Sequence, residues 1–198
     1  MSGWTRHEGL AVLLPEDNID TDRLIQARFM SAPRREGYGR FLLHDARFGP
    51  DGSELTHPLN DTPATVLVAG RNFGCGSSRE AAVYALVDFG VRAVLAPSFG
   101  DIFASNAVGN GLLPAVIEEE AYAALTGYLA DPQSLDIDLE TMTVSFGDRQ
   151  AALSLDPVWR TKIIRGWDDI DLTARHRPAL DAFAAARRAM GWTWPASE

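Results

Sequence analysis

The sequence of 198 residues contains a single cysteine, Cys75. An iron–sulfur cluster normally needs three or four thiolate ligands, and a structural zinc site needs several cysteine or histidine ligands. This chain therefore cannot hold a cluster by itself. The four histidines, His7, His44, His57 and His176, are scattered singly, which favours surface or hydrogen-bonded structural roles over catalysis.

Lysine and long apolar runs are also scarce. Lys162 is the only lysine, and the net charge is −9 at pH 7. Nucleic acids and anionic membranes attract clustered basic residues, so we expect neither as a partner. No apolar stretch approaches the roughly 20 residues that span a bilayer, and the N-terminal segment MSGWTRHEGL lacks the apolar core of a secretion signal. We therefore expect a soluble, cytoplasmic protein.

The pattern of apolar residues predicts an α/β fold in one domain over residues 1–198, because 46% of the residues are hydrophobic, enough for one well-buried core. Strands are predicted at Leu10–Pro15, Thr65–Ala69, Ala93–Ala96 and Leu112–Ile117. Helices are predicted at 81–89, Asp101–Gly109 and Glu118–Ala130. This order gives a parallel β-α-β-α-β core. A β-hairpin region (135–139, 142–146 and 151–155) and an amphipathic final helix (Pro178–Met190) follow.

The segment from Gly70 to Glu80, GRNFGCGSSRE, joins a predicted strand to a predicted helix. Its glycines permit positive φ and close approach of another molecule, which indicates a loop shaped around a ligand. Ser77 followed by Glu80 matches a capping box, which marks the start of a helix that runs through Ala81 to Phe89. Free amides at a helix N-terminus, together with the guanidinium of Arg79, would bind a carboxylate or phosphate.

One other interpretation of this loop stays open, and the matches to known nucleotide-binding motifs are weak. One alternative makes Ser77 only a helix cap and Arg79 only a surface residue. The dinucleotide fingerprint needs a third glycine where Arg79 stands, and the phosphate-binding P-loop needs a lysine that is absent. Cys75 as a nucleophile would need a base, and no histidine lies near it in the sequence, so a buried or incidental thiol is favoured.

Several motifs occur together and in order. NIDTDRLIQARFM (Asn18–Met30) precedes NFGCGSSRE, which is followed by VDFGVRAVLAPSFGDIF, NGLLP and RGWDDIDLT (Arg165–Thr173). Over nearly the whole chain these motifs resemble the small subunit of 3-isopropylmalate dehydratase, a split member of the aconitase superfamily. The resemblance implies a swivelling β/β/α domain. It also implies a separate, cluster-bearing large subunit that supplies the [4Fe–4S] cluster.

The resemblance also implies roles for residues in two loops. Ser77 would be the base that removes a proton next to a substrate carboxylate, while the cluster iron in the partner binds the departing hydroxyl. Arg79 would pair with a substrate carboxylate, for which its forked guanidinium is suited, and Ser78 would contact the same group. Thr21 and Asp22 would approach from the second loop, with Asp22 hydrogen-bonding within the catalytic network.

An alternative for Asp22 is a turn residue that caps its own loop, since Asn18 and Asp20 stand close by. Calcium binding by these three residues is disfavoured, because the later glycine and glutamate of an EF-hand loop are missing.

Substrate choice in the family depends on the loop after the DTD motif, which here is RFMSAP (Arg28–Pro33). Phe29 and Met30 offer apolar surface, and Ser31 brings no charge. Burial of an isopropyl group there gains roughly 1.5–3 kcal/mol, whereas an extra carboxylate would need a cation. The loop therefore favours isopropylmalate over homoaconitate-type substrates, unless one of three nearby arginines folds inward: Arg28, Arg34 or Arg35.

These features predict the small subunit of a heteromeric hydro-lyase that interconverts 2-isopropylmalate and 3-isopropylmalate in leucine biosynthesis. Two departures from the family pattern are Ala81, where histidine is common, and Gln26, where proline is frequent. They leave open a paralogous dicarboxylate hydratase of citraconate, dimethylmalate or homoaconitate type. A non-catalytic anion-binding module is the second alternative, and Ser77 distinguishes it, because binding alone would not need that hydroxyl.

Overall fold

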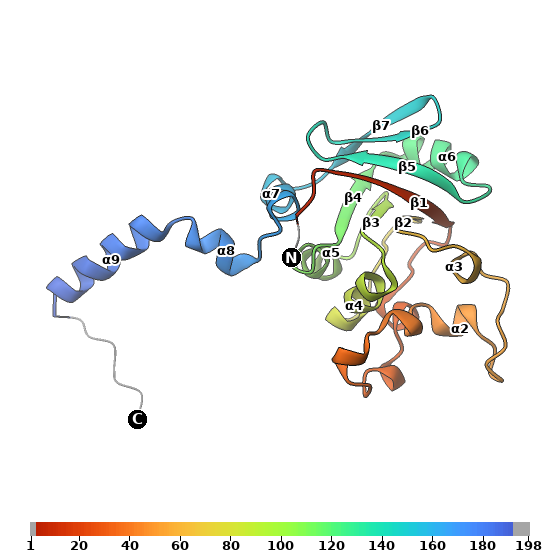
Figure 1. Cartoon of the computed structure of the whole chain (residues 1–198), viewed down its shortest axis with the longest axis horizontal. Helices are drawn as coiled ribbons and strands as arrows, with labels where there is room; N and C mark the ends of the chain where they lie inside the picture. Colours follow the sequence, from red (N-terminus) through yellow and green to blue (C-terminus); the bar gives the residue numbers. More distant parts are fainter. Residues whose placement is uncertain (1–2, 192–198) are drawn as a thin grey trace.

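The computed structural model describes residues 3–191. Seven strands in this range form one closed, mixed sheet in the spatial order β1-β2-β3-β4-β7-β6-β5 (Figure 1). The strands are β1 (Arg6–Leu14), β2 (Val66–Ala69), β3 (Ala93–Ala96), β4 (Leu113–Ile117), β5 (Gln133–Asp138), β6 (Thr143–Phe146) and β7 (Arg149–Ser154).

The first four strands are parallel to one another. Val66 pairs with Ala11 of β1 and with Ala93 of β3, and Ala93 pairs in turn with Leu113 of β4. Every residue of β2 and β3 is buried, as is usual for parallel strands covered on both faces. The strands of the predicted β-α-β-α-β core are therefore present, although β1 begins four residues earlier than predicted.

The last three strands are antiparallel and close the sheet. β5 and β6 form the predicted hairpin, and β7 continues it beside β6. β5 then pairs along β1, with Arg6 opposite Asp138, and β7 pairs with β4. Because both edges find partners, the sheet has no free edge strand within the described residues. The sequence pattern did not predict this closure.

Helices connect the parallel strands and fill the long N-terminal segment. The α-helices are α1 (Thr21–Leu24), α2 (His44–Arg47), α3 (Pro58–Asp61), α4 (Glu80–Phe89), α5 (Asp101–Gly109), α6 (Glu119–Tyr128), α7 (Pro157–Arg165), α8 (Asp169–Ala174) and α9 (Arg177–Ala189). Three short 3₁₀ helices lie between α1 and α2: η1 (Ala27–Phe29), η2 (Arg34–Glu36) and η3 (Gly39–Phe41). The sequence pattern did not predict α7, which begins at an Asp156 cap followed by proline.

Two apolar clusters lie on opposite faces of the parallel strands. Successive residues of β2 belong to different clusters. Leu67 lies in the cluster under α4, whereas Val66 and Val68 lie in the cluster shared with β5 and β6. This division follows the two-residue period of a strand. The N-terminal segment packs into the first cluster, so its loops lie beside the carboxyl ends of β1 and β2.

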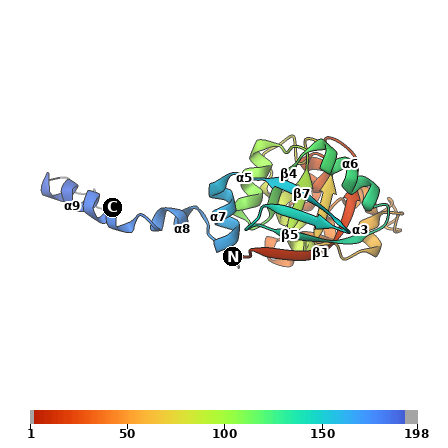
Figure 2. The same cartoon turned by 90° about the horizontal axis from the view of Figure 1, so that it is seen from above.

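The described part of the chain ends in two helices that leave the main body. α8 and α9 extend away from the closed sheet in both views (Figures 1 and 2), and none of their residues is buried. The predicted helix Pro178–Met190 corresponds to α9. Among the helices of residues 3–191, none combines the length and apolar character needed to cross a membrane.

Candidate active site

Three loops meet at the carboxyl ends of neighbouring parallel strands. The loop after β1 bonds to the loop after β2, with Asn18 N–H donating to the Arg71 carbonyl (2.8 Å), Gly74 N–H to Ile19 (2.7 Å) and Thr21 N–H to Cys75 (3.0 Å). On the other side of the β2 loop, Phe73 N–H donates to the Ser98 carbonyl of the β3 loop (3.1 Å). The glycine-rich segment 70–79 is therefore held between two other loops.

Glycine is required in this segment by both backbone angle and space. Gly74 has φ +72° and Gly76 has φ +95°, angles that glycine adopts without the steric penalty that other residues have. A Cβ at Gly74 would lie 2.2 Å from Cγ of Phe103, which is buried. The neighbouring Phe73 is fully buried and meets Phe103 edge-on at 5.3 Å between ring centroids. The aromatic pair fixes the path of the loop.

The predicted capping box is wrong. α4 begins at Glu80, with Arg79 rather than Ser77 at the N-cap position and no side-chain cap. The Ser77 carbonyl accepts hydrogen bonds from Thr21 Oγ1 (3.1 Å) and Arg79 N–H (2.7 Å), so it lies outside the helix. Glu80 Oε1 accepts from Asn110 Nδ2 (2.9 Å) and is not turned back toward Ser77. Ser77 and Ser78 consequently stand exposed in the loop just before the helix.

Arg79 forms an ion pair with Asp22 across the two loops, through Nη1 and Oδ1. Asp22 lies in the first turn of α1, whose N-terminus is capped instead by Asp20, which accepts from Arg23 N–H (2.7 Å). The capping alternative therefore describes Asp20 and not Asp22. Thr21, between them, is 1% exposed. The structure thus brings together four of the predicted residues, Thr21, Asp22, Ser77 and Arg79.

The predicted specificity residues lie in a different environment. Phe29 stacks on Phe41, with ring centroids 4.5 Å apart, and packs against the core. Met30 is 39% exposed, and Ser31 is exposed with its Oγ donating to the Arg28 carbonyl (3.2 Å). Within residues 3–191, no hydrogen bond or ion pair joins residues 29–31 to residues 77–79. Met30 and Ser31 are therefore accessible to another molecule, whereas Phe29 packs against the core.

Of the three arginines near this loop, Arg28, Arg34 and Arg35, two form ion pairs. Arg28 pairs with Asp45, and this hydrogen bond holds the pKa of the Asp45 carboxyl at about 2. Arg34 pairs with Asp88 at 2.6 Å, and its guanidinium lies 4.3 Å from the ring centroid of Tyr84. Arg35 is exposed and has no ion-pair partner in the part of the chain that the structure describes.

Sequence reasoning missed the residues that support the glycine loop from β3. Ser98 Oγ accepts from Asn72 N–H (2.8 Å), and Asn72 Nδ2 donates to Asn18 Oδ1 (2.7 Å). Asn72 has φ +56°, a left-handed conformation that asparagine tolerates better than most residues. The only signal in the sequence is the polar and glycine-containing stretch that directly follows each strand.

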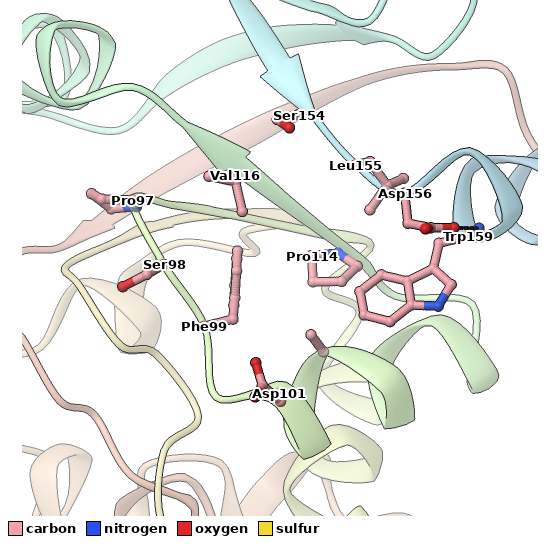
Figure 3. A pocket seen from close by; sticks show the side chains of 11 residues that line it. Pro97, Ser98, Phe99, Asp101, Pro114, Val116, Ser154, Leu155, Asp156 and Trp159 are labelled. Atoms are coloured by element: carbon pink, nitrogen blue, oxygen red, sulfur yellow. Dashed lines mark hydrogen bonds between the residues drawn. The ribbon is translucent and has the colours of Figure 1, made fainter.

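A cavity of about 590 Å³ lies beside this support (Figure 3). It extends from Ser98 and Phe99 across Pro114 to Trp159 of α7, and Asp101 and Asp156 stand among its lining residues. Its lining includes none of the predicted site residues. The candidate active site lies outside this cavity, at a junction of loops where Asp22, Ser77 and Ser78 are exposed.

The sequence of this chain is similar to those of known proteins over most of its length. Residues 1–120 match the family model described as "Aconitase C-terminal domain". The small subunit of 3-isopropylmalate dehydratase from Halalkalibacterium halodurans is 42% identical over 188 residues, which cover 91% of this chain and 96% of the relative. The small subunit from Gluconacetobacter diazotrophicus is 42% identical over 200 residues, which cover 97% of both chains.

The chain belongs to the family of 3-isopropylmalate dehydratase small subunits. A crystal structure of the family, 3-isopropylmalate dehydratase (leuD) from Methanocaldococcus jannaschii, has the same fold, with a TM-score of 0.68 over 89% of this chain and 98% of that chain. Its sequence identity is 24%, so this likeness concerns the fold alone.

Ala81, where the sequence departs from the family pattern, faces the apolar cluster under α4 and is 7% exposed. The change therefore lies on the buried side of the first turn of α4. Within residues 3–191, no group of three or more His, Cys, Asp or Glu side chains could hold a metal ion.

The glycine loop supports a prediction about stability. Gly74→Ala should destabilise the chain by roughly 2–5 kcal/mol, because a left-handed conformation costs a non-glycine residue about 1–2 kcal/mol and overpacking against Phe103 adds about 1–3 kcal/mol. Gly52→Ala is a matched control, since Gly52 has φ +79° but no neighbour within 4 Å. Urea unfolding of both variants measures the difference, and equal losses would contradict the steric argument.

Proposed function

We propose that this chain is the small subunit of a hydro-lyase that interconverts 2-isopropylmalate and 3-isopropylmalate by dehydration and rehydration in leucine biosynthesis. The observation that carries the proposal is the junction at which Ser77, Arg79 and Asp22 meet, in a chain whose relatives are 3-isopropylmalate dehydratase small subunits over nearly their whole length. No observation favours one of the paralogous hydratases.

Ser77 acts as the base in this proposal. Serine is a poor base in water, so the hydroxyl needs surroundings that stabilise its deprotonated form. The guanidinium of Arg79, two residues away, and the N-terminus of α4, which starts three residues later, both supply positive potential. Thr21 holds the carbonyl of Ser77, which fixes the backbone that presents the hydroxyl.

Arg79 binds a substrate carboxylate in this proposal, with help from Ser78. One guanidinium nitrogen contacts Asp22, and the guanidinium has five N–H donors in a fixed fork. The remaining donors suit a bidentate contact with a carboxylate. Asp22 then orients the guanidinium from the side opposite the substrate.

The partner in this proposal is a large subunit that carries a [4Fe–4S] cluster, which supplies the Lewis acid for the departing hydroxyl. The residues of this chain, with Cys75 as its only cysteine, do not fit a cluster. We further propose that residues 1–198 form one aconitase-type swivelling domain, that the chain is cytoplasmic, and that it closes over the cluster-bearing subunit. This chain contributes binding, orientation and proton transfer.

The loop at 28–31 supports an isopropyl substituent over a third carboxylate. Among residues 29–31 of this loop, Met30 and Ser31 are exposed, and neither is charged. Arg28 and Arg34, two of the nearby cations, are held by Asp45 and Asp88. An extra carboxylate would therefore lack these two partners, whereas an apolar group gains from burial beside Met30.

Turnover tests the proposal directly. The chain is mixed anaerobically with its host's cluster-loaded large subunit, and the unsaturated intermediate formed from 3-isopropylmalate is followed by absorbance. We expect kcat/KM of about 10⁴ M⁻¹s⁻¹ or more, and no turnover from the chain alone. Citraconate, dimethylmalate and homoaconitate serve as comparison substrates. A stable complex that is silent with 3-isopropylmalate but active with one of these would replace the proposed substrate.

A further inference from the structure

The C-terminal arm, defined as residues 168–191 with α8 and α9, leaves apolar side chains uncovered. It extends away from the closed sheet (Figures 1 and 2), and no residue of its two helices is buried. Eight large apolar side chains are exposed within residues 3–191, and four of them lie in this arm: Ile170, Leu180, Phe183 and Met190. Apolar residues gathered on one exposed element indicate an interaction site.

α9 has two distinct faces. Leu180, Phe183 and Met190 lie on one face, because they are spaced by three and seven residues. Phe183 is 65% exposed and Met190 is 72% exposed. Asp181 lies on the opposite face and forms an ion pair (3.1 Å) with Arg177, which borders the apolar face beside Leu180. A helix of 13 residues is marginal in water by itself, so burial of the apolar face is what would stabilise α9.

The root of the arm is fixed to the body. Lys162 of α7 is 6% exposed, and its Nζ forms an ion pair with Asp169 at 2.9 Å. Asp168 and Asp171 form a reciprocal capping box at the start of α8. Trp167 N–H also donates to the Lys162 carbonyl (3.0 Å). The body therefore sets where the arm begins, while Leu180, Phe183 and Met190 of α9 stay exposed within residues 3–191, with the Arg187 guanidinium 5.6 Å from the ring centroid of Phe183.

We infer that the arm docks on the large subunit, with the apolar face of α9 seated in an apolar groove that carboxylates border. The inference rests on the proposed function, which requires that partner. α9 contains three arginines and one aspartate in a chain of net charge −9, so this helix is complementary to an acidic rim. It has the apolar anchors of a helix-in-groove contact.

The arm lies in the part of the chain that a relative named as a small subunit also has. The aconitase C-terminal domain model ends at residue 120. That relative matches 97% of this chain. Because the arm has 24 residues, more than the unmatched remainder, the match includes most of the arm. The arm thus belongs to chains that are subunits of a larger enzyme. A stable interface usually takes about 20–30 residues from each side, and the arm supplies most of such a number.

Two variants of the full chain test the docking. Leu180→Gln with Phe183→Gln makes the apolar face polar, and Asp181→Gln with Ala185→Gln places the same two side chains on the opposite face. Each chain is titrated into the host's cluster-loaded large subunit, and Kd is measured by calorimetry. We expect the first variant to weaken binding at least about tenfold, as loss of buried apolar anchors does, and the second to stay within about twofold.

Further readouts separate this inference from the proposed function. Turnover at saturating concentrations of the Leu180→Gln, Phe183→Gln variant should match the parent chain, because the arm lies outside the site. Binding without turnover by the parent chain would refute the proposed function and leave the docking intact. Equal Kd for both variants would overturn the docking, as would failure of the parent chain to bind. A self-association lost only in the first variant, with Kd unchanged, would assign the face to a second copy.

Discussion

Replacing Ser77 with alanine should lower kcat of the reconstituted enzyme by about 10³-fold or more. A general base contributes roughly 10²–10⁴-fold, and its loss removes a proton transfer that stabilises only the transition state. Ser77 is exposed in the loop before α4, so the substitution creates no cavity in the core. Folding, binding to the large subunit and substrate affinity should therefore be retained. Single-turnover absorbance and equilibrium binding measure the two effects separately.

Ser78→Ala is the matched control for this experiment. Ser78 is the adjacent hydroxyl and is also exposed, but its proposed role is only an auxiliary contact with the substrate carboxylate. We expect mainly a higher KM, by about fivefold, the size of one neutral hydrogen bond. Near-normal turnover by Ser77→Ala would refute the role of Ser77. Intact ligand binding without turnover in the parent chain would instead support an anion-binding module.

Arg79→Gln is expected to lower kcat/KM by about 10²–10³-fold, because the substrate carboxylate loses a bidentate, charge-assisted contact, and each hydrogen bond to a charged group contributes roughly 1.5–3 kcal/mol. Loss of the ion pair with Asp22, whose side chain is 58% exposed, adds little. Arg79→Lys keeps the charge but not the planar fork, so its kcat/KM should fall between the parent and Arg79→Gln. Steady-state kinetics on all three chains measures the series.

Arg71→Gln provides a control from the same loop. Arg71 also carries a guanidinium and forms an ion pair, with Glu119 at 2.8 Å, but both side chains are more than half exposed. Exposed ion pairs contribute little, so kcat/KM should stay within about twofold of the parent value. An equal effect of the two substitutions would mean that Arg79 acts only through general positive potential.

Much of the fold follows from local sequence pattern. The buried strand at 93–96 and the helix at 101–109 have the predicted bounds, because apolar periodicity depends on neighbouring residues only. The motif from Gly70 to Glu80 located the candidate site for the same reason, since glycine at positive φ is a local requirement. The single cysteine likewise limits, without any structure, what this chain can ligate.

Tertiary contacts decided what the local pattern could not. The sheet closes because β5 pairs with β1, which lies about 130 residues earlier in the chain. α4 begins at Glu80 rather than Ser77 because Thr21 and Asn110, both distant in sequence, hold the Ser77 carbonyl and the Glu80 carboxylate.

The partner of Arg79 is Asp22, 57 residues away. Conversely, the periodicity of α9 predicts a helix with an apolar face but carries no information about what covers it. Sequence determined which residues could act, and three-dimensional packing determined which of them meet, because contacts between distant segments depend on the folded chain and not on local pattern.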